Sequence, residues 1–196
     1  MTATLKPRRS ALYMPGSNQR ALEKAKTLDV DCLLLDLEDA VAPDAKALAR
    51  DQIVSAVSEG GYAEREVVIR INGLDSPWGE DDLAAAVKAN PDAILVPKVN
   101  APADLQLIAH KLAVLGASND LKLWAMMETP EAMLNAGAIG ACGKDPEVRL
   151  SCFVMGTNDL AKETRARLTP GRAAMMPWLM TCVAAARAGG IDILGG

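Results

Sequence analysis

Polar and charged side chains follow a series of short apolar runs, and they include the residue types that bind metals and anions. The runs end in, or lead into, the segments Leu35-Asp36-Leu37-Glu38-Asp39, Arg70-Ile71-Asn72, Pro97-Lys98, Met127-Glu128-Thr129 and Gly156-Thr157-Asn158-Asp159. The carboxyl ends of strands carry the active site in barrels and in open α/β sheets alike, so these side chains are the candidates for chemistry. The pattern as a whole is more specific than any single residue in it.

Glu128 and Asp159 are the pair best suited to hold a cation. They follow successive apolar runs, and neighbouring parallel strands lie only ~4.8 Å apart. Two carboxylates that close repel each other unless a proton or a cation lies between them. With no histidine or cysteine ligand nearby in sequence, Mg²⁺ fits best, because it accepts one or two protein carboxylates and leaves positions for water and an anionic substrate.

Each acidic residue also has a purely structural alternative. A Glu or Asp at a strand end is often a helix cap or a solvated charge, and Thr129 can cap the following helix in place of Glu128. Asp159 can cap its own helix. Asp39 is expected in a loop or an outer shell, and Lys98 is as readily a solvated side chain as a ligand.

Two groups of basic residues could bind an anion. Arg70 offers a planar fork of N–H groups for a substrate carboxylate or for an oxygen on which charge develops. Ser17 precedes a segment that carries Lys24, and a helix start of this kind suits a phosphate. We expect Arg9 to add its charge on the same side, although ordinary helix capping is the alternative at Ser17.

The apolar runs predict seven strands that alternate with helices. The strands are expected at Ser10–Pro15, Cys32–Leu37, Val67–Ile71, Ala93–Pro97, Leu121–Met127, Ser151–Met155 and Ile191–Leu194. The helices are expected at Arg20–Leu28, Ala45–Ser58, Asp81–Ala89, Pro102–Leu115, Pro130–Ala141 and Met176–Ala188. A repeat of roughly 30 residues is the size of a βα unit, which leaves a doubly wound sheet or a TIM barrel. No glycine-rich nucleotide motif is present, which disfavours nucleotide-binding folds.

Composition narrows the function further. The chain has 196 residues, of which 50% are apolar and only 3% aromatic, with a net charge of −4. This predicts a single domain over residues 1–196 and disfavours a nucleic-acid binder, which needs a basic face and stacking rings. No run is long and apolar enough to span a membrane. No apolar signal core follows the charged segment Met1 to Arg9, and the four widely spaced cysteines indicate buried, reduced thiols, so we expect a cytoplasmic protein.

The ordered motifs resemble those of a known enzyme family. They are Arg9-Ser10-Ala11-Leu12-Tyr13-Met14-Pro15-Gly16, Leu35-Asp36-Leu37-Glu38-Asp39-Ala40-Val41, Arg70-Ile71-Asn72, Pro97-Lys98, Met127-Glu128-Thr129 and Gly156-Thr157-Asn158-Asp159-Leu160. Across essentially its whole length the chain resembles the citrate lyase beta subunit-like (CitE-like) branch of the HpcH/HpaI aldolase family, which includes malyl-CoA and citryl-CoA lyases.

The resemblance implies a TIM (β/α)8-type barrel with Mg²⁺ at its carboxyl rim. It implies Glu128 and Asp159 as metal ligands, with Arg70 and Glu128 as catalytic and substrate-binding residues. The remaining residues that the resemblance and the charge pattern assign to the substrate are Lys98, Asp36, Glu38 and Asp39. A weaker inference assigns Arg9, Ser17 and Lys24 to the coenzyme A diphosphate.

The resemblance also implies an activity and an assembly. We expect a Mg²⁺-dependent carbon–carbon lyase that cleaves a citryl-CoA- or malyl-CoA-like thioester into an acyl thioester and a 2-oxo acid, in a homo-oligomer, either a trimer or a hexamer. One alternative is a thioesterase, in which water attacks malyl-CoA at the same metal site. Another is a non-catalytic truncated homologue, since a (β/α)8 barrel usually takes ~250 residues and this chain ends just after its seventh strand begins.

Overall fold

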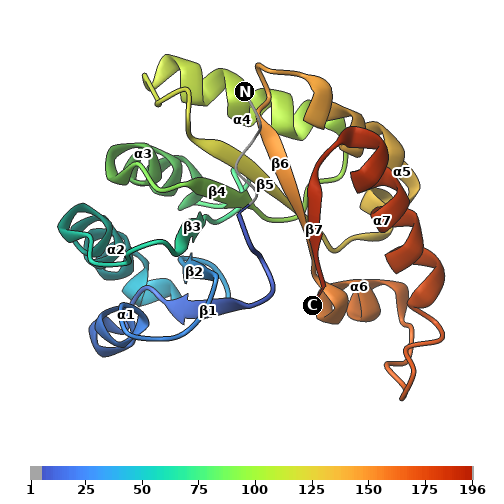
Figure 1. Ribbon diagram of the computed structural model, residues 1–196, viewed down its shortest axis with the longest axis horizontal. Helices are drawn as coiled ribbons and strands as arrows, with labels where there is room; N and C mark the ends of the chain where they lie inside the picture. The colour runs from blue at the N-terminus through green and yellow to red at the C-terminus, as the bar shows by residue number, and fades with distance from the viewer. Residues whose placement is uncertain (1–5, 196) are drawn as a thin grey trace. The chain divides into compact units, whose positions relative to one another are not determined.

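The computed structural model describes residues 6–195, in which strands and helices alternate (Figure 1). The strands are β1 (Ala11–Pro15), β2 (Cys32–Asp36), β3 (Glu66–Arg70), β4 (Ala93–Val96), β5 (Lys122–Met127), β6 (Leu150–Met155) and β7 (Asp192–Leu194). The helices are α1 (Gln19–Ala25), α2 (Lys46–Glu59), α3 (Gly79–Ala89), α4 (Pro102–Val114), α5 (Pro130–Ala141), α6 (Thr157–Thr164) and α7 (Met176–Gly189), with short 3₁₀ turns η1 (Pro43–Ala45) and η2 (Cys142–Lys144). The strands follow chain order in the sheet, which is the order of a barrel and not of a doubly wound sheet, whose strand order reverses at a switch point.

All seven expected strands are present, with bounds that differ from the expected ones by a residue at most. Three helix expectations are corrected. Helix α1 ends at Ala25 and not at Leu28, helix α3 begins at Gly79 and not at Asp81, and α6 (Thr157–Thr164) was not expected. Only Thr157, Leu160 and Ala161 of α6 are buried, so its sequence lacks the apolar stripe that marks a core-facing helix. The end residue Gly196 and the first half of the Met1–Arg9 segment lie outside the described residues.

The chain divides into two compact units, residues 1–94 and 95–196. In the N-terminal unit, β1, β2 and β3 are parallel, with Pro15 opposite Asp36 and Asp36 opposite Arg70. Every residue of β2 and β3 is buried, as expected for parallel strands covered by helices. Helices α1, α2 and α3 lie on the same side of these strands (Figure 1). The register therefore brings Asp36 and Arg70 together at the carboxyl ends of β2 and β3.

In the C-terminal unit, β5, β6 and β7 are parallel, and Met127 lies opposite Met155. Helices α5 and α7 pack closely because glycines face each other. A Cβ atom on Gly189 would stand 2.0 Å from the carbonyl oxygen of Gly140, a distance that no side chain tolerates. The unit thus holds the ends of β5 and β6 side by side.

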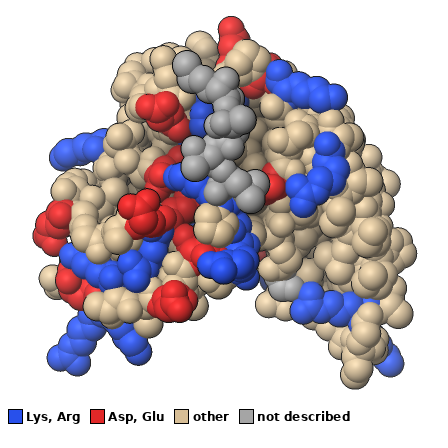
Figure 2. All heavy atoms as spheres, viewed as in Figure 1, with Lys and Arg blue, Asp and Glu red and all other residues tan. Residues whose placement is uncertain are grey.

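Three properties of the described residues bear on the function classes considered above. All four cysteines are buried, and none is bonded to another. No helix among residues 6–195 has the length and hydropathy to cross a bilayer. On the face in Figure 2, acidic and basic side chains are interspersed over the N-terminal unit, whereas the surface over α5 and α7 is largely uncharged.

Candidate active site

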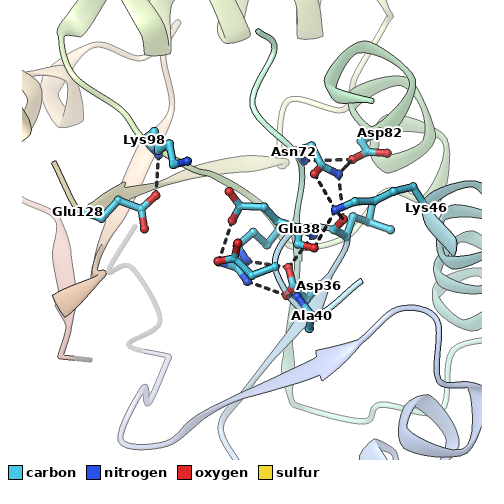
Figure 3. Close-up of polar contacts among 11 residues, drawn as sticks. Asp36, Glu38, Ala40, Lys46, Asn72, Asp82, Lys98 and Glu128 are labelled. Carbon is cyan, nitrogen blue, oxygen red and sulfur yellow. Dashed lines mark hydrogen bonds and ion pairs between the residues drawn. The ribbon is translucent and has the colours of Figure 1, made fainter. Parts of the chain in front are cut away.

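Glu128 lies directly after β5 and is buried, with 1% of its surface exposed. Its Oε1 atom accepts a hydrogen bond of 2.8 Å from the backbone N–H of Lys98 (Figure 3). Lys98 holds a left-handed backbone with φ +50°, a conformation that costs a non-glycine residue of order 1 kcal/mol or more. The main chain of Lys98 therefore positions Glu128, while the Lys98 side chain itself is exposed.

The other carboxylate oxygen of Glu128 lies against Gly156, the residue that follows β6. A Cβ atom on Gly156 would stand 2.5 Å from Oε2 of Glu128 and 3.0 Å from Cε of Met126. The backbone of Gly156 has φ −89°, which any residue adopts. Glycine is therefore required at this position by the approach of Glu128 and not by the backbone.

Thr129, and not Glu128, caps helix α5. The Thr129 hydroxyl accepts a hydrogen bond of 3.0 Å from the N–H of Ala132 and donates one to Oδ1 of Asn100. Asn100 is itself held through its carbonyl oxygen by the amide of Asn135 at 2.8 Å. The helix N-terminus is thus satisfied without Glu128, which is neither a cap nor a solvated charge.

Asp159 lies in the first turn of α6, three residues after Gly156, and is half-buried. An acidic side chain in the first turn is stabilised by the helix dipole. Glu128 and Asp159 thus follow neighbouring strands on either side of the Gly156 contact. Among residues 6–195 there is no group of three or more His, Cys, Asp or Glu side chains arranged to hold a metal.

Arg70 is the centre of a second cluster, which lies in the N-terminal unit. Its Nε and Nη2 atoms each donate a hydrogen bond of 2.6 Å to the two oxygens of Asp36, a bidentate pair. Nη1 lies 2.8 Å from Oε2 of Glu38 and 3.2 Å from Oδ2 of Asp39. The guanidinium carbon also lies 4.9 Å from the ring centre of Tyr13, within cation–π range. We call Arg70, Asp36, Glu38 and Asp39 the arginine cluster.

Burial and charge act in opposite directions on Arg70. Its side chain is buried, which disfavours the charged form, but the hydrogen bonds and charge of Asp36, together with the charge of Glu38, raise the pKa of Arg70 above its ordinary value. The guanidinium therefore stays charged and held in a fixed orientation. Of its three acidic partners, Asp39 is the most exposed and the most distant, with a side chain that is 68% exposed.

A buried polar network beside the arginine cluster was not singled out from the sequence. Lys46 of α2 is 5% exposed, and Asp82 of α3 is fully buried. The Lys46 ammonium donates to Oδ1 of Asn72 at 2.9 Å, and Asn72 donates its side-chain and backbone N–H groups to Asp82 (Figure 3). The spacing of residues along α2 could have indicated this burial, because Lys46 lies on the same helix face as the buried residues Ala49, Ile53 and Ala56.

The structure does not bring Arg9 together with Ser17 and Lys24. Arg9 precedes β1, and its side chain pairs with Asp31 at 2.7 Å, an ion pair that lowers the pKa of Asp31 to about 2. Ser17 follows the opposite end of β1, and Lys24 is an exposed residue of α1. Oδ1 of Asn18 accepts from the N–H of Ala21, so α1 has the ordinary helix cap that the alternative interpretation proposed, but Asn18 and not Ser17 supplies it. The expectation that Arg9 adds charge beside Ser17 is corrected.

Comparison with known proteins decides the family. The family model described as HpcH/HpaI aldolase/citrate lyase matches residues 9–196. The chain belongs to the HpcH/HpaI aldolase/citrate lyase family. This confirms the resemblance drawn from the motifs, and it places the chain in a family of enzymes.

Relatives and solved structures of the family give the fold and qualify the activity. A (3S)-malyl-CoA thioesterase of Cereibacter sphaeroides is 48% identical over 190 residues, covering 97% of this chain and 63% of that protein. Citrate lyase subunit beta of Haemophilus influenzae is 31% identical over 193 residues, covering 96% of this chain and 65% of that protein. The citrate lyase beta subunit of M. tuberculosis, solved with oxaloacetate and magnesium, superposes with a TM-score of 0.77 at 25% identity, covering 96% of this chain and 79% of that one.

The expected TIM-barrel-type α/β fold is confirmed by this structural likeness. The chain spans less than two thirds of the length of these curated relatives. The expectation of a carbon–carbon lyase is wrong, because the HpcH/HpaI relatives at 48% identity are thioesterases and the citrate lyase subunit stands at 31%. The reason for the error is chemical. Carboxylates and an arginine that bind an acidic thioester serve either reaction, and the motifs alone do not distinguish water from a carbon–carbon bond as the reacting group.

Proposed function

We propose that the protein hydrolyses a malyl-CoA-like thioester, releasing free coenzyme A and the hydroxy acid. The observation that carries this proposal is the 48% identity with (3S)-malyl-CoA thioesterase over 97% of the chain. In this reaction a water oxygen bonds to the thioester carbonyl carbon and the carbon–sulfur bond breaks. The water loses its proton, and the leaving thiolate gains one.

Arg70 is proposed to bind a carboxylate of the acyl group. The bidentate pair with Asp36 fixes the plane of the guanidinium, and a planar fork matches the geometry of a carboxylate. Nη1 is shared with the exposed Asp39 at 3.2 Å, the weakest of its contacts. A substrate carboxylate that replaces Asp39 on Nη1 would gain a charged donor without disturbing the pair with Asp36.

Glu128 and Asp159 are proposed to hold Mg²⁺. The fit rests on the donor set: Oε1 of Glu128 is held by Lys98, and the absence of a Cβ on Gly156 lets the Glu128 carboxylate lie against the start of α6, the helix that carries Asp159. Two carboxylates are a sufficient protein contribution for Mg²⁺, which keeps waters and substrate oxygens as its other ligands. When bound, the ion would act as a Lewis acid and as a template for the substrate oxygens.

Product analysis tests the proposal. The protein is incubated with (3S)-malyl-CoA in Mg²⁺ and, separately, in EDTA, and free thiol, malate and 2-oxo acid are measured. We expect free thiol and malate in equal amounts with Mg²⁺ and little of either in EDTA. A 2-oxo acid released with an acyl-CoA, or no turnover in any condition, would contradict the proposal. Glu131→Gln, an exposed acidic residue of α5, is the control that leaves activity unchanged.

A further inference from the structure

Lys46 has a buried ammonium group that contacts the segment after β2, which carries the three acidic residues of the arginine cluster. Its Nζ atom donates to the carbonyl oxygens of Leu37 and Glu38, both at 2.7 Å, and to Oδ1 of Asn72 at 2.9 Å (Figure 3). An ammonium has three N–H groups, so this set satisfies all of them. The ring centre of Trp78 lies 5.2 Å from Nζ. The side chain is therefore fixed in position.

The segment from Asp36 to Ala40 is held from two directions. The Asp36 carboxylate accepts from the N–H groups of Glu38 at 2.9 Å and of Ala40 at 3.0 Å. The Lys46 ammonium donates to the carbonyl oxygens of Leu37 and Glu38 in the same turn. Because Glu38 and Asp39 belong to this turn, its conformation sets how their carboxylates meet Arg70.

The second anchor of Lys46 is the end of β3. Asn72 follows Arg70, the last residue of β3, by two residues. Its Nδ2 atom donates to the carbonyl oxygen of Leu37 at 2.8 Å, and its backbone N–H donates to Asp82 at 3.0 Å. Lys46 and Asn72 thus tie the chain after β2 to the chain after β3.

We propose that Lys46 is a positioning residue: it fixes the Leu37–Glu38 turn and Asn72 so that Arg70 presents its guanidinium to the substrate carboxylate. This inference rests on the proposed function for the role of Arg70 toward substrate, but not for its orientation. All three N–H groups of Lys46 donate to protein oxygens. Its charge also offsets that of Asp36, Glu38 and Asp39, which together carry more negative charge than Arg70 balances.

The test compares Lys46→Met, Arg70→Lys and the double variant with the wild-type protein. The control is Lys88→Met, an exposed lysine in the last turn of α3. We expect Lys46→Met to lower kcat/KM for malyl-CoA by about 10- to 100-fold, mainly through KM, as misplacement of a substrate-binding group does. Since both changes act through one group, the double variant should be no worse than Arg70→Lys alone. Additive losses would overturn the proposal.

A second readout does not depend on turnover. The Nε–H proton of Arg70, which donates to Asp36 at 2.6 Å, is assigned by its loss in Arg70→Lys, and its exchange with solvent is followed by NMR. We expect exchange to be about tenfold faster or more in Lys46→Met and unchanged in Lys88→Met. Unchanged exchange in Lys46→Met would overturn the proposal, whereas an inactive wild type would contradict only the proposed function. If Lys46→Met does not fold, Lys46→Gln, which keeps two N–H donors, is measured in its place. We then expect the same loss of kcat/KM and the same faster exchange, both smaller than for Lys46→Met.

Discussion

Gly156 lies directly against Glu128, so that a Cβ atom at position 156 would stand 2.5 Å from both Cβ and Oε2 of Glu128. Strand pairing produces this contact, because the N–H of Gly156 donates to the carbonyl oxygen of Met127 at 3.2 Å. The carboxylate is confined between this glycine and the backbone of Lys98. The position of Glu128 is thus set by main-chain geometry on two sides.

Gly156→Ala should lower kcat/KM about tenfold or more, because the added methyl group displaces the Glu128 carboxylate. Gly137→Ala is the matched control, since Gly137 lies on the exposed side of α5 and a Cβ there meets nothing within 4 Å. That substitution should leave activity unchanged and stabilise the helix by up to about 1 kcal/mol. Steady-state kinetics and thermal unfolding of both variants measure these effects, and full activity in Gly156→Ala would contradict the assigned position of Glu128.

Glu128→Gln should weaken Mg²⁺ binding about tenfold or more, because an amide lacks the charge that attracts the ion. The change keeps the size of the side chain and an oxygen that can accept from Lys98. Calorimetric titration with Mg²⁺ measures the affinity, and Glu131→Gln gives the background for loss of an acidic residue from the same region. Equal affinity in wild type and Glu128→Gln would exclude Glu128 as a metal ligand.

Asp36→Asn and Asp39→Asn should differ sharply in their effect on stability. Asp36 is fully buried and makes both short contacts with Arg70, so its neutralisation leaves a buried guanidinium without its main partner and should cost about 3 kcal/mol of unfolding free energy. Asp39 is exposed, and its loss should cost less than about 1 kcal/mol. Urea unfolding monitored by circular dichroism compares the two, and similar losses would contradict the unequal roles within the arginine cluster.

The cysteines should be unreactive in the folded protein at pH 8. Burial raises the pKa of Cys182 to about 11, and burial together with the charge of Glu66 raises the pKa of Cys32 to about 12. The native thiols therefore stay protonated where unfolded thiols begin to ionise, so stability should fall as the pH rises from about 9 toward these values. Iodoacetamide labelling followed by mass spectrometry checks this, and rapid labelling of Cys182 at pH 8 would contradict its burial.

The strand positions could be predicted from sequence because buried parallel strands form continuous apolar runs, as in Cys32-Leu33-Leu34-Leu35. The placement of Glu128 after β5 and of Arg70 at the end of β3 followed from those runs. The network of Lys46 and Asp82 could not be predicted in the same way, because a charged residue in an amphipathic helix is ordinarily solvated. Its burial depends on acceptors from the chain after β2 and β3, which only tertiary structure brings together.

The choice between hydrolysis and bond cleavage also lay beyond the motifs. An arginine and carboxylates that bind an anionic thioester suit both reactions, so such residues predict the substrate class better than the reaction. The difference lies in whether water reaches the thioester carbon. That property depends on the whole lining of a site, which six short segments do not describe.

Turnover of (3S)-malyl-CoA in water enriched in oxygen-18 tests the central claim most directly. Mass spectrometry of the products should find malate with one heavy oxygen in a carboxylate group, together with unacylated coenzyme A, because water supplies the oxygen that replaces sulfur. Acetyl-CoA accompanied by glyoxylate, with no labelled malate, would contradict the account.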